Sequence, residues 1–245
     1  MCGRFTITQP AVVIAALPCL VMDKLPTPRY NVAPGQQAPM VRLKNGRMEL
    51  VQATWGLAPR FADADARLLI NARSQSVHQK PTFAPLFVGR RCVIPADGFY
   101  EWPQNGRQGA EAHYFKFRGN DCCGFAGIWD GENSGVKPDG IRFVILTTSA
   151  LAPVCEIHDR MPVILRRDRI MDYLSEPAEA EIHSPGSQEE VASAGTRAHA
   201  RLMAMISAWD SDLLESIPVG RAVNRVSNDS PECIRLRPPK EGLFN

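Results

Sequence analysis

The sequence has no apolar run that approaches the ~20 residues needed for a membrane-spanning helix. It also has no basic stretch followed by an apolar one at its start, because MCGRFTITQP turns polar at once. These absences predict an intracellular, cytoplasmic protein with no membrane partner. With 245 residues, 44% of them hydrophobic, the chain holds enough apolar side chains to build its own core.

Motifs for nucleotide cofactors and for metals are also missing. The chain contains neither a G-x-G-x-x-G pattern nor a Walker loop, and it shows no heptad or solenoid repeat. Its seven cysteines include no C-x-x-C pair, and the neighbours Cys122 and Cys123 suit neither a metal chelate nor an unstrained disulfide. We therefore expect no cofactor, no metal and the free thiols of a reducing compartment.

The chain has little excess of positive over negative charge. The chain carries 28 basic and 26 acidic residues, for a formal net charge of +2. Dedicated duplex-DNA binders are usually more basic, so any contact with nucleic acid should be local. Small arginine clusters do occur, and solvated faces are the default interpretation of such clusters: Arg90-Arg91, Arg166-Arg167 with Arg169, and Arg235 with Arg237.

Short strands dominate what is present. The clearest signal is a hairpin over residues 40–57, where Asn45-Gly46 supplies the positive φ of a tight turn. Further strands are predicted at 5–8, 91–102, 113–119, 122–130 and 142–150, and near the end in VGRAVNRV and ECIRLR. Helices are predicted at 10–17, within 68–79, at 167–175 and at 198–209, with a loop at 27–36 and a surface insertion or mobile loop at 176–197. This pattern predicts a single α+β domain, residues 2–240, with mainly antiparallel sheets and short flanking helices.

Polar residues interrupt or end several of these apolar strands. Glu101 follows an aromatic strand and precedes Trp102, surroundings that would raise its pKa and suit acid–base work. An exposed strand end explains Glu101 alone equally well. His158 is predicted on a turn, and Asn71 either caps a following helix or points its amide into a cleft.

The remaining candidates are less specific when taken singly. Arg73 and Arg160 are typical of surface charges, and Trp55, which precedes Gly56, is more typical of a core than of a stacking platform.

Cys2 is unusual because of its position. Once Met1 is removed, Cys2 carries a free α-amine and a thiol on adjacent carbons. An internal cysteine offers sulfur alone. The cysteine side chain is small enough for methionine removal, so the sequence makes a paired nucleophile possible at this end.

Several blocks in order resemble one known family. They are MCGRF, RYNVAPGQ, WGLAP, INARSQ, RCVIPADGFYEW, FAGIWD, LTTSA and IHDRMPVIL. Together they resemble the SRAP domain from Cys2 to about Leu174, and weakly again at VGRAVNRVSNDSPECI. The segment 176–197 does not match, and Gln75 stands where many relatives carry an acidic residue. The resemblance implies a barrel-like core of antiparallel sheets and a monomer.

The resemblance also implies a function and a site. SRAP proteins act on abasic sites in single-stranded DNA, where the N-terminal cysteine closes a thiazolidine ring with the sugar aldehyde. By that likeness Cys2 is the nucleophile, Glu101 the acid–base group, His158 an aid to proton transfer, and Asn71 a holder of Cys2 or the sugar. Contacts to the DNA are implied for Arg4, Arg73 and Arg160 at phosphates, Thr147 as a neutral contact, and Trp55 with Gly56 beside a base.

Two alternatives remain open at this point. One is a cysteine peptidase, self-processing or general, that uses Cys2 and His158, with Glu101 assisting. The other is a module that binds single-stranded DNA without chemistry and in which Cys2 is incidental.

Overall fold

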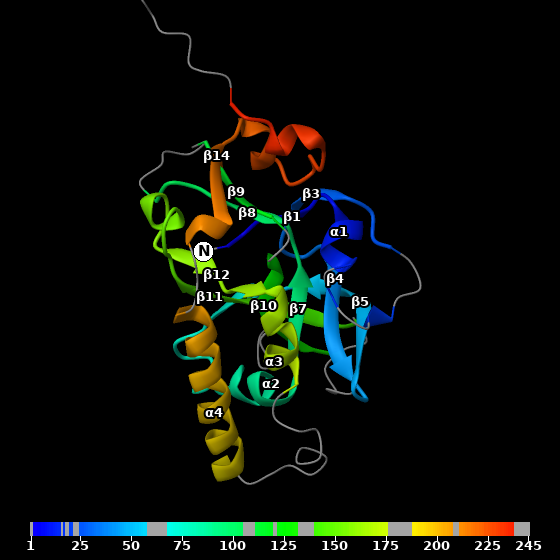
Figure 1. The fold of residues 1–245 in the computed structure, drawn as a ribbon, viewed down its shortest axis with the longest axis vertical. Coiled ribbons are helices and arrows are strands. Elements are labelled where there is room, and N and C mark those ends of the chain that lie inside the picture. The colour runs from blue at the N-terminus through cyan, green and yellow to red at the C-terminus, as the bar shows by residue number, and fades with distance from the viewer. Residues whose placement is uncertain are drawn as a thin grey trace, which may run out of the picture.

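Two β-sheets form the centre of this computed structural model, which describes residues 2–15, 17, 20–21, 25–57, 68–104, 111–119, 122–131, 140–175, 188–207 and 211–237 (Figure 1). The strands are β1 Phe5–Ile7, β2 Leu20–Val21, β3 Arg29–Val32, β4 Gln37–Lys44, β5 Arg47–Trp55, β6 Asn71–Arg73, β7 Arg91–Pro95, β8 Gly98–Glu101, β9 His113–Phe117, β10 Cys122–Asp130, β11 Arg142–Ser149, β12 Arg160–Pro162, β13 Ile164–Arg166 and β14 Leu214–Pro218. The smaller sheet has the order β14-β9-β8-β1-β3, and the larger runs β12-β11-β10-β7-β4-β5-β2 with β13 on β10 and β6 on β11.

Part of the larger sheet closes on itself. Strands β11, β10, β7, β4 and β5 pair in this order through antiparallel ladders. A parallel pairing of β5 with β11 completes the ring. The predicted α+β class with mainly antiparallel sheets is thereby confirmed.

The hairpin prediction is also confirmed. Strands β4 and β5 pair up to Lys44 and Arg47, and the turn between them places Asn45 at φ 51° and Gly46 at φ 72°. Both angles lie in the left-handed region, which glycine and asparagine adopt at the lowest cost.

Three local predictions are wrong, each because tertiary pairing overrides local pattern. The expected helix within 68–79 is instead β6 followed by turns, since Asn71–Arg73 pairs in parallel with β11. The expected loop at 27–36 contains β3, which pairs with β1. The two expected final strands are short 3₁₀ helices, η5 Arg221–Asn224 and η6 Pro231–Ile234.

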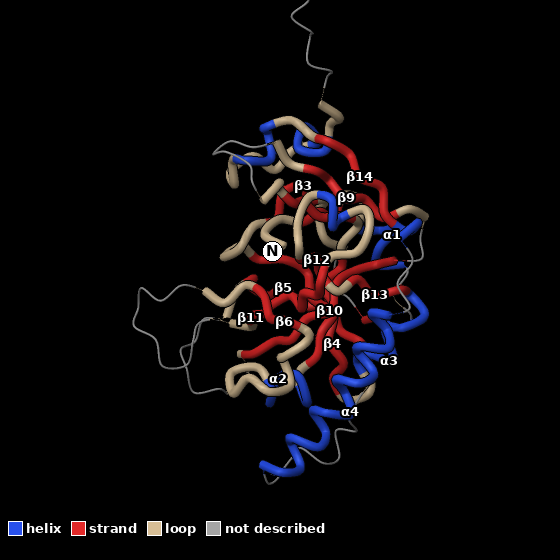
Figure 2. Tube along the Cα trace, turned by 90° about the vertical axis from the view of Figure 1, so that its left-hand side faces the viewer, coloured by secondary structure: helices blue, strands red, loops and turns tan. Residues whose placement is uncertain are grey.

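Four α-helices are described: α1 Pro10–Ala15, α2 Ala84–Gly89, α3 Ile170–Leu174 and α4 Gln188–Ser207, with 3₁₀ turns η1 Val154–Glu156, η2 Arg167–Arg169 and η4 Ser211–Leu213. Helices α2 and α4 pack together at one end of the molecule, and α3 lies beside the larger sheet, against β7 (Figure 2). Helix α4 begins at Gln188 rather than at 198, so the later part of the segment 176–197 is helical. Its earlier part, 176–187, lies outside the described residues. None of the described helices has the length and apolar character needed to cross a membrane.

A buried aromatic cluster joins the two sheets. The ring of Phe5 on β1 lies 5.3 Å from that of Trp55 and 5.9 Å from that of Phe125, measured between centroids. Cys2 belongs to the same buried cluster. Burial of each large apolar side chain contributes roughly 1.5–3 kcal/mol, so this packing fixes the start of the chain against both sheets.

Candidate functional site

Pairing of β1 with β8 brings Cys2 to Glu101. Phe5 lies opposite Phe99, and the N–H of Tyr100 donates to the carbonyl of Arg4 (3.0 Å). Glu101 is the last residue of β8 and lies close enough for its charge to act on the Cys2 thiol. Two segments a hundred positions apart therefore meet through one short antiparallel ladder.

The Cys2 thiol is buried and stays protonated. Cys2 is 0% exposed. This burial, followed by the negative charge of Glu101, raises the pKa of the Cys2 thiol far above its ordinary value. The other cysteines with described side chains are also free thiols, of which Cys92 and Cys233 are buried and Cys155 is exposed. No group of three or more His, Cys, Asp or Glu side chains within the described ranges is placed to hold a metal ion.

Glu101 is poised to act as acid and as base. It is 3% exposed, and burial raises its pKa to about 7, although the positive charge of the amino terminus works in the opposite direction. Both protonation states are therefore populated at neutral pH. Its Oε2 lies 4.0 Å from Nε2 of His158.

His158 is held as a neutral imidazole. Its Nδ1 accepts the backbone N–H of Arg160 (2.9 Å) and lies 3.0 Å from Oδ1 of Asp159. Burial, and next the charge of the amino terminus, lower the pKa of His158. The bond from Arg160 assigns the ring proton to Nε2, the nitrogen that faces Glu101.

Asn71 links the larger sheet to Cys2. Its Nδ2 donates to the carbonyl oxygen of Cys2 (2.8 Å) from the first residue of β6. Its Oδ1 is buried and has no hydrogen-bond partner among the described residues. Asn71 thus caps no helix, and it leaves one acceptor available beside Cys2.

Arg160 and Arg73 lie on β12 and β6, two strands that both pair with β11, near this group. Arg160 donates through Nη2 to the carbonyl (2.6 Å) and hydroxyl (3.1 Å) of Thr147 and to Oε1 of Gln75 (3.1 Å). Burial, followed by the charge of Arg73, lowers the pKa of Arg160. Thr147 is 0% exposed, so it anchors Arg160 and cannot itself reach a ligand at the surface.

Trp102 and Arg4 lie next to each other, and each is close in sequence to Glu101 or Cys2. The guanidinium of Arg4 lies 5.9 Å from the Trp102 ring centroid, and the indole N–H of Trp102 donates to Oδ1 of Asn224 (2.9 Å). Arg4 and Trp102 are both partly exposed. No role of its own was expected for Trp102, although its place directly after Glu101 in the sequence was a signal for one.

Trp55 and Gly56 do not fit a DNA contact, which corrects that part of the expected set. Trp55 is 0% exposed and donates its indole N–H to the carbonyl of Ile70 (2.9 Å). Gly56 is buried at φ 121°, and a Cβ there would lie 3.1 Å from Leu68. A base cannot stack on a fully buried ring, so both residues serve the core.

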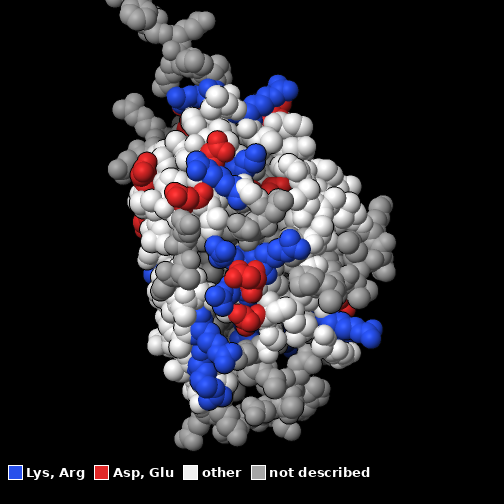
Figure 3. Space-filling model, in the orientation of Figure 1, with Lys and Arg blue, Asp and Glu red and all other residues white. Residues whose placement is uncertain are grey.

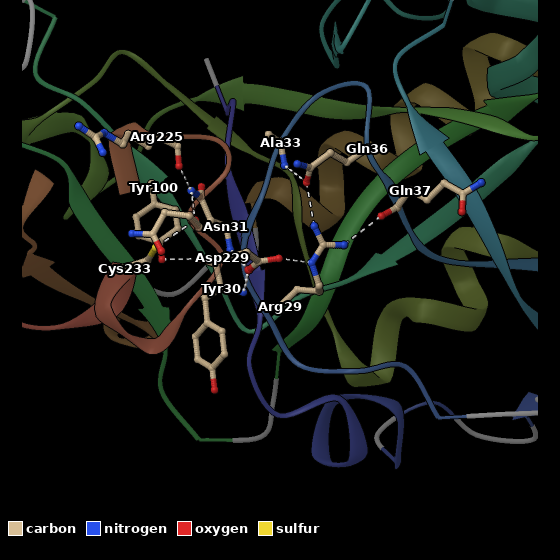
Figure 4. Close-up of polar contacts among 11 residues, drawn as sticks. Arg29, Tyr30, Asn31, Ala33, Gln36, Gln37, Tyr100, Arg225, Asp229 and Cys233 are labelled. Atoms are coloured by element: carbon tan, nitrogen blue, oxygen red, sulfur yellow. Dashed lines mark hydrogen bonds and ion pairs between the residues drawn. The ribbon is translucent and has the colours of Figure 1, made fainter. Parts of the chain in front are cut away.

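A network around Asp229 fastens the C-terminal segment to the smaller sheet (Figure 4). Oδ1 of Asp229 accepts the N–H groups of Tyr30 (2.5 Å) and Asn31 (2.9 Å), and its Oδ2 pairs with Arg29. The Asn31 amide donates to the carbonyls of Val223, Arg225 and Asn228. The segment that carries Asn224 is therefore held where it can orient Trp102.

The structure brings the expected residues together in two groups. Cys2, Asn71, Glu101 and His158 are linked by the contacts above. The arginines expected to bind DNA lie around them, namely Arg4 beside Trp102, and Arg73 and Arg160 beside Thr147. A buried acid–base pair beside a nucleophile, with cations around it, can carry out addition to a carbonyl of an anionic substrate.

Comparisons with known proteins found several similar sequences. The chain is 31% identical over 242 residues to the abasic site processing protein YoqW of Bacillus subtilis, covering 96% of this chain and 99% of the relative. It is 28% identical to the abasic site processing protein YedK of Escherichia coli, covering 96% and 99%. Against the abasic site processing protein HMCES of Gallus gallus the identity is 29%, covering 87% and 68%.

Solved structures share the fold. A protein from Bacteroides thetaiotaomicron superposes with a TM-score of 0.67 at 18% identity, covering 96% of this chain and 100% of the other. A phage-related protein from Bordetella bronchiseptica gives a TM-score of 0.66 at 23% identity, covering 89% and 94%. The family model described as SOS response associated peptidase (SRAP) matches residues 1–226. The chain belongs to the SRAP family.

Proposed function

We propose that this protein processes abasic sites in single-stranded DNA by forming a covalent crosslink through Cys2. One observation carries the proposal: Glu101, His158 and Asn71 gather around Cys2, with a carboxyl group whose pKa is about 7. The names of the relatives, abasic site processing proteins, support the choice of substrate.

The reaction uses both nucleophiles of Cys2. Removal of Met1 frees an α-amine with an ordinary pKa of ~7.7–8.0, so part of it is neutral at physiological pH. This amine adds to the aldehyde carbon of the ring-opened sugar, and loss of one water gives an imine. The thiol then adds across the C=N bond, so that sulfur bonds to carbon and a proton ends on nitrogen, which closes a thiazolidine.

The surrounding residues supply the proton transfers. Protonated Glu101 would transfer its proton to the sugar ring oxygen as the ring opens. Because the Cys2 thiol remains protonated, ring closure needs a base as the C–S bond forms, and ionised Glu101 is the adjacent carboxylate. Neutral His158 would relay protons around the imine. Oδ1 of Asn71 would accept a hydrogen bond from a sugar hydroxyl.

The DNA strand would lie across the partly exposed cations. Arg4, Arg73 and Arg160 would contact phosphates on either side of the lesion. Trp102 takes the aromatic role first expected of Trp55, because it is partly exposed beside Arg4. Stacking on such a ring contributes about 1–3 kcal/mol per base.

The peptidase alternative fits the thiol poorly. A cysteine that attacks peptides is activated by a lowered pKa. Burial and Glu101 raise the pKa of Cys2 instead. The amine-first reaction does not require a thiolate, so the same environment suits crosslinking.

The direct test compares abasic and intact strands. Protein with Met1 removed, as verified by intact mass, is incubated with a single-stranded oligonucleotide that contains one abasic site, and with the same strand intact. We expect a heat-stable adduct on a denaturing gel with the abasic strand alone. Equal retention of both strands and no adduct would favour a binding module, and thiol-dependent peptide hydrolysis without an adduct would favour the peptidase.

Gln75→Glu is expected to weaken binding to intact single-stranded DNA by about 2–5-fold, since a carboxylate would pair with Arg160 and offset its charge. The slope of affinity against salt should also become shallower. Binding is measured by fluorescence anisotropy at several salt concentrations. Gln52→Glu adds the same charge at an exposed position of β5. Equal losses in the two variants would show that only net charge matters.

A further inference from the structure

Asp159 is a carboxylate beside His158 to which the proposed reaction gives no role. It directly precedes β12, and its side chain is 66% exposed, whereas those of His158 and Glu101 are 15% and 3% exposed. Its Oδ1 lies 3.0 Å from Nδ1 of His158, and Nε2 of the same ring lies 4.0 Å from Oε2 of Glu101. The imidazole of His158 therefore lies between a buried carboxyl group and an exposed carboxylate.

The neighbour of this carboxylate sets it apart from other exposed ones. On the face shown in Figure 3, acidic side chains lie among Lys and Arg side chains. Asp168, for example, pairs with Arg166 and Arg169. Those cations keep their charge at any ordinary pH, whereas the charge of an imidazole changes with each proton that it takes or gives. The contact between Asp159 and His158 can therefore change during a reaction.

Nδ1 of His158 has both a hydrogen-bond donor and an acceptor beside it. The backbone nitrogen of Arg160 lies 2.9 Å away, and Oδ1 of Asp159 lies 3.0 Å away. A ring nitrogen has one in-plane position, which holds either a lone pair or a proton. With a lone pair, Nδ1 accepts from Arg160 and the ring proton is on Nε2. With a proton, Nδ1 donates to Asp159, and the lone pair is on Nε2, which faces Glu101.

We propose that Asp159 is a positioning residue for the crosslinking reaction, which accepts a hydrogen bond from Nδ1–H of His158 and so leaves Nε2 free to take a proton. The inference rests on the function proposed above. Imine formation moves both protons of the Cys2 amine to the oxygen that leaves as water. In such a transfer an N–H bond breaks at the amine and one forms at Nε2, and the resulting imidazolium gives that proton to the oxygen. A carboxylate on Nδ1–H fixes the tautomer and stabilises the imidazolium.

The charged groups around the ring make this carboxylate important. Burial, and next the amino terminus, lower the pKa of His158, and Asp159 opposes them. Arg160 acts in both directions, because its backbone N–H raises that pKa and its charge lowers it. Arg73 adds a second positive charge next to Arg160, and Glu101 faces the other edge of the ring. Without Asp159, an imidazolium here would lose a negative charge that favours it.

The test compares two substitutions of Asp159. Asparagine keeps the shape of aspartate, but its amide can donate to Nδ1 and so fix the ring proton on Nε2, whereas alanine removes the carboxylate and adds no donor. Crosslinking to an abasic single strand is measured in single turnovers at saturating protein. Asp159→Asn should slow the adduct by about 10-fold and Asp159→Ala by only about 3-fold. A larger loss in alanine than in asparagine would show a packing role and contradict the proposal.

Glu156→Gln is the matched control. Glu156 is exposed on η1, two residues before His158, so this variant loses the same charge from the same segment. It should crosslink at the rate of the unsubstituted chain. The proposal is wrong if Asp159→Asn also keeps that rate, or if Glu156→Gln is slowed as much as Asp159→Asn.

A second arm needs neither DNA nor crosslinking. NMR of the His158 ring nitrogens is followed against pH in the same variants. In Asp159→Asn the ring should titrate at a lower pH than in Glu156→Gln, and its neutral form should keep the proton on Nε2. Identical titrations would overturn the proposal. An unsubstituted chain that forms no adduct would instead contradict the proposed function, and the titration would still decide whether Asp159 controls His158.

Discussion

Cys2→Ala protein is expected to form no heat-stable adduct with an abasic strand, while it still captures the strand as a reducible imine. Alanine keeps the α-amine and, being small, allows Met1 to be removed, but it has no sulfur to close the ring. Reactions run with and without borohydride separate the two species on a denaturing gel. The adduct trapped by borohydride should appear with both proteins. The adduct that needs no reductant should appear only with the unsubstituted protein, which keeps Cys2.

The control for this experiment is Cys155→Ala. Cys155 is exposed and free, close in sequence to His158, so an adduct made by any accessible thiol would be lost here. We expect this variant to crosslink as the unsubstituted chain does. A stable adduct from Cys2→Ala at the normal yield would contradict the thiazolidine. Protein that retains Met1 should form no adduct that survives without reductant, because its Cys2 nitrogen is an amide and cannot share a ring with the thiol.

Glu101→Gln is expected to slow adduct formation by about 100-fold at neutral pH, the scale of one general acid–base group. Glutamine has nearly the shape of the glutamate side chain but neither gives nor takes a proton in this range. Affinity for an intact strand should change little, since the DNA contacts lie on the arginines. The rate is measured from single-turnover gels and the affinity by anisotropy. Unchanged rates would make Glu101 a bystander.

The same substitution should stabilise the fold at high pH. The pKa of Glu101 is about 7 in the folded chain against an ordinary 4.5, so between these values the folded state binds more protons than the unfolded state. Stability from this group is therefore complete below pH 4.5 and is lost as pH rises through 7. Glu101→Gln removes that loss and should gain about 3 kcal/mol at pH 8 and little at pH 5.

Urea unfolding at the two pH values checks this expectation. A variant that is less stable at both pH values, by the same amount, would show that glutamine only disturbs packing. A gain confined to pH 8, together with the slow crosslinking, would tie the raised pKa to the chemistry. The two readouts are independent, because one is measured without DNA.

Sequence patterns predicted those elements whose signals are local. The β4–β5 hairpin follows from alternation around Asn45-Gly46, and α1 from the proline at its first position. The strand β6 and the 3₁₀ turns η5 and η6 were missed because distant partners specify them. Asn31 and Asp229, which fasten the C-terminal segment, had no local signal at all, since their bonds span nearly the whole chain.

The sequence by itself determined that an N-terminal cysteine could become a double nucleophile, and it determined the fold class and the family resemblance. Only the tertiary structure decided that Glu101, His158 and Asn71 gather near that cysteine and that Trp55 belongs to the core. The reason is physical. Backbone propensity acts between neighbours in the chain, whereas burial and charge depend on which strands pair and which faces meet.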